Sequence, residues 1–107
     1  TFSASEFGRS LTTNNRGSDH AWGGNQWIMG GAINGKRIYG QYPDLYEDGP
    51  LDTGRGRFIP TTSVDELAAE LALWLGVSKT DLPIILPNIS RFYDINGVAN
   101  PIGFIGI

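Results

Sequence analysis

Apolar residues recur with a helical period in one segment of this 107-residue chain. They stand three or four positions apart along a single stripe, which comprises Val64, Leu67, Ala68, Leu71, Trp74 and Leu75. Ser63 before the stripe and Glu66 after its first residue match a capping box, and Gly76 supplies a C-terminal stop. The sequence therefore predicts one amphipathic helix over residues 63–75.

Shorter apolar runs predict extended structure elsewhere. Residues 1–7 have the pattern of a strand, and Gly8 permits a sharp exit from it. Asn34-Gly35 separates two apolar-rich runs and predicts a hairpin over residues 27–42, because a type I′ turn requires positive φ at both central residues. The apolar tail, residues 102–107, predicts a final strand or extended segment.

Polar and glycine-rich stretches separate these elements. Residues 8–26 predict a long loop, and loops of that length in compact domains are functional or mobile. A second irregular stretch covers residues 43–60, and residues 78–81 predict a short helical turn that Pro83 breaks. The chain opens on an extended run with no turn signal before it, so we expect residues 1–107 to be a single fragment of a larger domain.

Composition narrows the classes of function. The net charge is -3 and the basic residues are scattered, which disfavours nucleic acid as a partner. The chain has no cysteine, which excludes disulfides and thiolate metal sites. No apolar run approaches the ~18 residues of a membrane-spanning helix, so the sequence predicts no membrane span.

The only histidine stands beside a carboxylate in the glycine-rich stretch Ser18-Asp19-His20-Ala21-Trp22-Gly23-Gly24. Neighbours on a regular strand point to opposite faces, so Asp19 and His20 can reach one metal centre together only from a loop. An imidazole with a carboxylate suits zinc, manganese or iron, whereas carboxylates alone suit magnesium or calcium. The alternative is an ordinary turn in which His20 packs on Trp22 and hydrogen-bonds to a backbone carbonyl.

Glu6 and Arg9 are further candidates near the end of the first predicted strand. Glu6 is placed to be a third metal ligand, because ligand-binding residues gather at the carboxyl ends of strands in α/β folds. Arg9 is a candidate contact for an anionic substrate group through its planar guanidinium. The alternatives are a Glu6–Arg9 ion pair, or Glu6 as the cap of the following turn.

Arg55 and Arg57 alternate with glycines in Gly54-Arg55-Gly56-Arg57. Two guanidinium groups at this spacing can clamp a phosphate or sulfate of a substrate through bidentate contacts. Ion pairs with nearby carboxylates such as Asp48 and Asp52 are the alternative role. The sequence contains no nucleophile elbow, dinucleotide fingerprint or phosphate-binding loop.

In combination, these motifs resemble one bacterial family, the domain of unknown function 1501. The resemblance covers nearly the whole chain, and its motifs are Ser5 to Arg9, Ser18 to Gly24, Gly30 to Gly40, Gly54 to Asp65 and Leu86-Pro87-Asn88. That family is in turn distantly similar to the alkaline phosphatase and sulfatase superfamily. The resemblance implies an α/β fold, with this chain as the C-terminal part of an alkaline-phosphatase-like domain.

By that resemblance, Asp19 and His20 correspond to ligands of a divalent metal. Glu6, from its place at the end of the predicted strand, is expected to be a further ligand or an orienting group. Members of the family commonly look exported, which implies a periplasmic or extracellular location. The chain departs from the superfamily's pattern, because a long stretch separates Glu6 from Asp19 and no histidine follows His20.

The resemblance implies that the parent protein is a metal-dependent hydrolase of phosphate or sulfate esters that uses zinc, manganese, calcium or magnesium. The remainder of the parent chain or other subunits are then its partners, and the fragment alone is inactive. The main alternative is a non-catalytic exported surface or assembly protein that retains the fold. Asp19 and His20 side chains that face away from any shared point would favour that alternative. A carbohydrate-binding module is a third reading and requires a flat, exposed pair of tryptophans.

Overall fold

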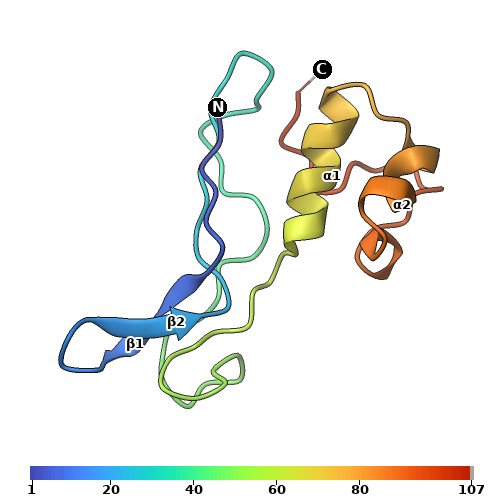
Figure 1. The fold of residues 1–107 in the computed structure, drawn as a ribbon. Helices are drawn as coiled ribbons and strands as arrows, with labels where there is room; N and C mark the ends of the chain where they lie inside the picture. Colours follow the sequence, from blue (N-terminus) through green and yellow to red (C-terminus); the bar gives the residue numbers. More distant parts are fainter. Residues whose placement is uncertain (107) are drawn as a thin grey trace. The chain divides into compact units, whose positions relative to one another are not determined.

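The computed structural model describes residues 1–106 and combines a two-stranded antiparallel sheet with two α-helices and two short 3₁₀ helices (Figure 1). The fold is therefore mixed, in agreement with the α/β prediction at its coarsest level. The chain divides into two compact units. The first unit comprises Thr1–Gly30 and Gln41–Thr61, and the second comprises Gly31–Gly40 and the chain from Thr62 onward. Among the described helices, none has the length and apolar character needed to cross a membrane.

The first unit contains a hairpin where the sequence predicted a loop. β1 (Gly8–Thr13) pairs antiparallel with β2 (Ser18–Ala21). The turn between them is closed by a hydrogen bond of 3.1 Å from the Asn14 amide to the Gly17 carbonyl. The prediction of one long loop over residues 8–26 is wrong, because these polar strands lack the apolar alternation that ordinarily marks a strand.

β1 also bonds to a segment far along the chain. The amides of Leu11 and Thr12 donate to the carbonyls of Gly56 and Arg55, at 3.2 and 3.3 Å. A Cβ on Gly56 would stand 2.6 Å from the Cβ of Leu11, and the φ of Gly56 is 70°. Close approach and backbone conformation both require glycine at this position.

The N-terminal residues pair with a distant segment and do not form a regular strand. Backbone hydrogen bonds join residues 1–3 to residues 27–29 around an isolated antiparallel bridge between Phe2 and Ile28. The strand predicted for the N-terminus is thus shortened to this ladder. The first regular strand begins at Gly8, where the sequence predicted an exit.

The hairpin predicted around Asn34-Gly35 is absent from the described residues. The Gly35 amide donates to the Ile33 carbonyl at 2.9 Å, so a tight turn does form at this position. Ile33, however, bridges Ile105 near the C-terminus and not a residue just after the turn. A turn signal is local, whereas the partner of each arm depends on packing with distant residues.

α1 (Val64–Trp74) confirms the predicted helix. The Glu66 amide donates to Ser63 Oγ at 3.1 Å, and the Ser63 amide donates to Glu66 Oε2 at 2.8 Å. This reciprocal pair is the predicted capping box, which satisfies two backbone donors at the helix start. Gly76, with a φ of 101°, follows the last turn as expected for a C-terminal stop.

The buried face of α1 differs from its most apolar face. An apolar stripe ordinarily faces the core, yet Val64 is 75% and Leu75 is 74% exposed. The helix buries Ala69 and Glu70 instead. Ala69 belongs to the core of the second unit, which also comprises Leu82, Ile89 and Tyr93 and is flanked by Ala72, Leu73, Val77, Leu86 and Ile95.

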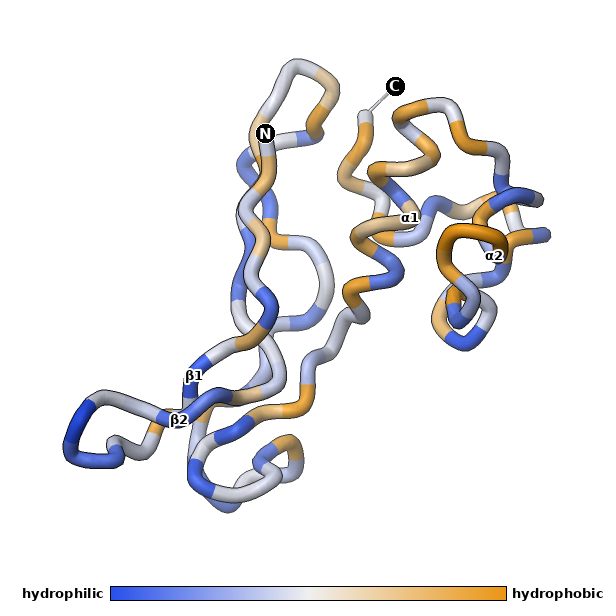
Figure 2. Tube along the Cα trace, in the orientation of Figure 1, coloured by the Kyte–Doolittle hydropathy of each residue, from blue (hydrophilic) through white to orange (hydrophobic). Residues whose placement is uncertain are grey.

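Three short helices complete the second unit, namely η1 (Lys79–Asp81), α2 (Leu82–Ile85) and η2 (Ile89–Arg91). η1 confirms the helical turn predicted for residues 78–81. Pro83 does not break this segment but lies in the first turn of α2, where a missing N–H costs little. Hydrophobic residues gather in α1 and α2, whereas the β1–β2 hairpin is largely hydrophilic (Figure 2).

The carboxylate of Glu70, a residue that is 1% exposed, holds the C-terminal segment. Its Oε2 accepts hydrogen bonds from the amides of Ile102 and Gly103, both at 2.6 Å, and its Oε1 accepts one from the amide of Ile105 at 2.8 Å. These donors offset the cost of removing the carboxylate from water. The final strand or extended segment predicted for the tail forms only in part, since residue 102 is a bend and Gly103 has a φ of 93°, whereas Ile105 forms an isolated bridge with Ile33. Residue 107 of that prediction lies outside the described residues.

Candidate functional site

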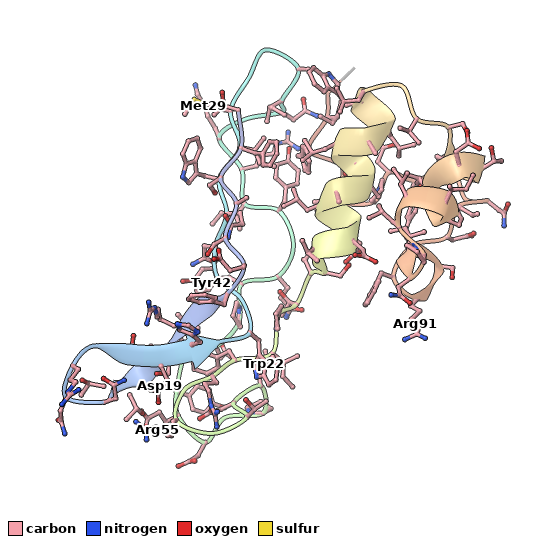
Figure 3. All side chains as sticks on the ribbon, viewed as in Figure 1. Asp19, Trp22, Met29, Tyr42, Arg55 and Arg91 are labelled. Atoms are coloured by element: carbon pink, nitrogen blue, oxygen red, sulfur yellow. The ribbon has the colours of Figure 1, made fainter. Side chains whose placement is uncertain are left out.

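Asp19 lies on β2 and makes two side-chain contacts. Its Oδ1 accepts a hydrogen bond of 2.8 Å from the side-chain amide of Asn14. Its Oδ2 lies 3.6 Å from Nη2 of Arg55, which also donates to the Thr13 carbonyl at 3.3 Å. Asp19 and Arg55 lie side by side next to the hairpin (Figure 3). The carboxylate thus links the turn of the hairpin to the segment that carries Arg55.

His20 belongs to a different set of contacts. Its ring stacks on that of Phe7, with centroids 3.7 Å apart and an interplanar angle of 19°. Arg9 lies opposite His20 in the strand register, and its Cζ is 5.4 Å from the centroid of the same Phe7 ring. We call these three residues the Phe7 cluster. The stacking partner of His20 is thus Phe7, and the indole of Trp22, the partner that the alternative named, donates to Thr53 Oγ1 at 2.9 Å.

The separate contacts of Asp19 and His20 follow from their place on a strand, where neighbours point to opposite faces. Glu6 lies at an exposed bend just before β1. Among residues 1–106, no group of three His, Asp or Glu side chains is arranged to hold a metal ion. The Asp19 and His20 side chains therefore have different contacts in this structure. The predicted metal site of Glu6, Asp19 and His20 stays a prediction.

The expected ion pair between Glu6 and Arg9 is not formed. Nη1 of Arg9 donates to the Ser18 carbonyl at 2.7 Å, which ties the guanidinium to β2. Within the described part of the chain, the ion pair between Arg55 and Asp19 is the one present. The role of Arg9 as a substrate contact stays a prediction.

The segment that carries Arg55 is wrapped around the carboxylate of Asp52. Its Oδ1 accepts hydrogen bonds from the amides of Gly54, Gly56 and Arg57 at 2.8, 3.0 and 3.2 Å, and its Oδ2 accepts one from the amide of Asp48 at 2.9 Å. Backbone amides that converge in this way form an anion-binding nest, and here a carboxylate of the chain itself fills it. These hydrogen bonds lower the pKa of Asp52, and the bond from the Asp48 amide contributes most.

The two arginines of this segment have separate partners. Nε of Arg57 donates to the Gly54 carbonyl at 2.9 Å, so this side chain serves its own loop. The sequence suggested Asp48 or Asp52 as ion-pair partners of these arginines, but Arg55 pairs with Asp19. Their predicted role as a clamp for a substrate anion stays a prediction. An aspartate followed by closely spaced glycines is a signal that points to the loop around Asp52.

Acid is expected to loosen this loop. The pKa of Asp52 is lower in the folded chain than in the unfolded one. Its bonds therefore stabilise the fold fully above the ordinary aspartate pKa of about 3.9, and this stabilisation is lost as the pH falls through the lowered folded value. Amide chemical shifts of Gly54 and Gly56 during an acid titration measure the loss. Shifts that stay constant down to pH values well below the ordinary pKa of aspartate would contradict it, and Asp52→Asn, in which the titrating group is absent, is the control.

The chain belongs to the family described as "Protein of unknown function (DUF1501)", whose sequence model matches residues 1–83. This match confirms the family resemblance and spans the β1–β2 hairpin, the Asp52 loop and α1. No curated protein and no solved structure matches the chain.

Proposed function

Starting from membership of that family, we propose that the chain is a non-catalytic component of an exported surface or assembly protein that retains an alkaline-phosphatase-like fold. The observation that carries the proposal is the divergence of Asp19 and His20. The carboxylate contacts Asn14 and Arg55, whereas the imidazole stacks on Phe7. A hydrolase with both residues on one metal would need the two side chains to converge, so their separate contacts support the non-catalytic role.

The extended backbone of β2 opposes a shared metal more strongly than the ion pair between Arg55 and Asp19 does. The Arg55 and Asp19 side chains are 51% and 43% exposed. Pairs of this kind contribute at most about 1 kcal/mol, so Arg55 alone would not keep a metal ion away from Asp19. To bring both Asp19 and His20 to one ion, the extended backbone of β2 would have to change at Asp19, which lies between the paired positions Ser18 and His20 of the ladder.

Exposed apolar side chains support the role in assembly. In the first unit, large apolar residues at least half exposed are Leu11, Trp22, Trp27, Met29, Tyr42 and Tyr46. Aromatic residues and methionine are enriched in protein interfaces relative to the remaining surface. Exposed apolar side chains that gather in a contiguous patch mark surfaces that contact another polypeptide.

A hydrolase of phosphate or sulfate esters is the second candidate, and the Phe7 cluster favours it. Arg9 and His20 are exposed and lie opposite each other on the hairpin. Arg9 uses Nη1 for the Ser18 carbonyl, which leaves other guanidinium N–H groups for an oxyanion. In this hypothesis Arg9 binds the ester group, and His20 is available as one ligand of a divalent metal such as zinc or manganese.

The metal content of the chain separates the two candidates, because the fragment alone is expected to be inactive under either of them. We expect the chain to carry no stoichiometric zinc or manganese by plasma mass spectrometry. We also expect no release of p-nitrophenol from its phosphate or sulfate ester above background, in the unaltered chain or in Asp19→Ala and His20→Ala. A stoichiometric metal ion that both substitutions remove would falsify the proposal.

A further inference from the structure

We propose that the Asn96-Gly97 step is a site of spontaneous modification, at which the asparagine loses ammonia and becomes aspartate or isoaspartate. The chain contains two Asn-Gly steps, and their local sequences match, because residues 33–35 and residues 95–97 both read Ile-Asn-Gly. Both asparagines are exposed and both lie in the second unit. The contacts that hold each step therefore decide which of them reacts in the folded chain.

The reaction begins with attack of the glycine nitrogen on the side chain of the preceding asparagine. The nitrogen of Gly97 loses its proton to water and forms a bond to Cγ of Asn96. The bond from Cγ to Nδ2 breaks, and that nitrogen takes up a proton and leaves as ammonia. Water then opens the resulting succinimide ring at Cγ, which gives aspartate, or at the main-chain carbonyl carbon, which gives isoaspartate. Glycine favours ring closure because no Cβ hinders the approach of its nitrogen.

Asn34 is held by contacts with distant parts of the second unit. Its amide donates to the Phe104 carbonyl at 2.9 Å, and its own carbonyl accepts a hydrogen bond of 2.6 Å from the Tyr39 hydroxyl. Its carboxamide lies against the backbone of Gly106, where a Cβ would stand only 2.7 Å from Cγ of Asn34. The ring closes only if the asparagine turns its side chain toward the next nitrogen. At Asn34, the C-terminal segment would first have to move.

Asn96, in contrast, is held by a single turn. Its amide donates to Asp94 Oδ1 at 3.0 Å, and the Gly97 amide donates to the Asp94 carbonyl at 3.1 Å. The glycine amide is hydrogen-bonded in both steps, so this bond does not distinguish them. Within residues 1–106, no hydrogen bond engages the carboxamide or the carbonyl of Asn96. The opening of one exposed turn costs less free energy than the opening of a packed segment, so Asn96 reaches the reactive geometry more often.

Modification at this step also changes the loop around it. Nζ of Lys79 donates to the carbonyls of Gly97 and Ala99, at 2.8 and 3.3 Å, and lies 5.7 Å from the centroid of the Tyr93 ring. Isoaspartate adds a methylene to the main chain just before Gly97 and shifts this carbonyl relative to the ammonium. We therefore expect the modified chain, separated by its extra negative charge, to have a lower midpoint of urea unfolding than the unmodified chain.

Incubation of the whole chain at mildly alkaline pH, followed by peptide mass spectrometry, measures both steps in one sample. In the folded chain we expect Asn96 to lose ammonia at least about tenfold faster than Asn34, since reaction at Asn34 requires the C-terminal segment to open. In concentrated urea we expect the two asparagines to react at similar rates, because their neighbours in sequence match.

Gly97→Ala and Gly35→Ala form a matched pair of variants. A Cβ at position 97 would lie 3.3 Å from the Asp94 carbonyl oxygen, and one at position 35 would meet nothing within 4 Å. Neither glycine has a positive φ, so both variants are expected to fold. In the folded chain we expect Gly97→Ala to slow the reaction at Asn96 about tenfold and Gly35→Ala to leave it unchanged, because the added Cβ hinders only the adjoining step.

Equal rates at the two steps of the folded chain, or a faster reaction at Asn34, would overturn the inference. So would an unmodified Asn96 after an incubation that converts both asparagines in urea. An unchanged unfolding midpoint of the modified chain would overturn the expected effect on the loop. The reaction is independent of the proposed role in assembly, because it takes place within the chain and needs only water.

Discussion

Replacing Glu70 with alanine is expected to lower the free energy of unfolding of the second unit by about 3 kcal/mol. The backbone amides of Ile102, Gly103 and Ile105 all donate to this carboxylate. A buried donor without an acceptor costs about 1–3 kcal/mol, and partial access of water to the tail reduces the total. Native domains are stable by about 5–15 kcal/mol, so the loss is a large share of what holds the unit folded.

A conservative substitution sharpens this prediction. In Glu70→Gln the amide oxygen can replace one carboxylate oxygen, but the amide nitrogen then faces a backbone N–H, so a smaller loss remains. Urea unfolding followed by the helical circular dichroism signal measures both variants, and hydrogen exchange at Ile102 and Gly103 tests whether the tail is released. Asp65→Asn, also on α1, is the control. Equal stability of Glu70→Ala and the Asp65 variant would show that the tail does not depend on this carboxylate.

Leu82→Ala is expected to cost about 2–5 kcal/mol, because it leaves a cavity in a small core. Leu82 is fully buried on α2 and belongs to the cluster with Ala69, Ile89 and Tyr93. Few other apolar residues of the second unit are buried to this degree, so few neighbouring side chains can move into the cavity.

The same helix offers a matched control for this substitution. Ile84 on α2 is 76% exposed, and its replacement by alanine is expected to change the stability by no more than about 0.5 kcal/mol. Urea unfolding of the two variants, side by side, measures the difference. A loss in Ile84→Ala as large as that in Leu82→Ala would mean that α2 packs through its other face.

Local signals in the sequence predicted α1 and its boundaries. The capping box of Ser63 and Glu66 and the stop at Gly76 act within one turn of the helix, so they can be read without knowledge of the fold. The face that α1 buries is decided by distant contacts. Glu70 is buried because the amides of the C-terminal tail converge on it, and no periodicity of apolar residues indicates a buried carboxylate.

The sequence predicted the candidate site only in part, because distant contacts also decide which of its residues meet. The sequence singled out Asp19, His20, Arg9, Arg55 and Arg57, and the structure brings some of them together. Arg9 and His20 meet across the hairpin, and Asp19 meets Arg55. These pairings depend on the strand register and on the loop around Asp52, which a single sequence does not specify.

Zinc binding by Arg55→Ala tests most directly whether Asp19 and His20 serve separate contacts. This substitution removes the cation beside Asp19 and leaves β2 in place. Isothermal titration calorimetry should show that Arg55→Ala binds zinc no more tightly than the unaltered chain, because the two side chains still point to opposite faces. Tighter zinc binding by Arg55→Ala that is lost on replacing either Asp19 or His20 with alanine would contradict this.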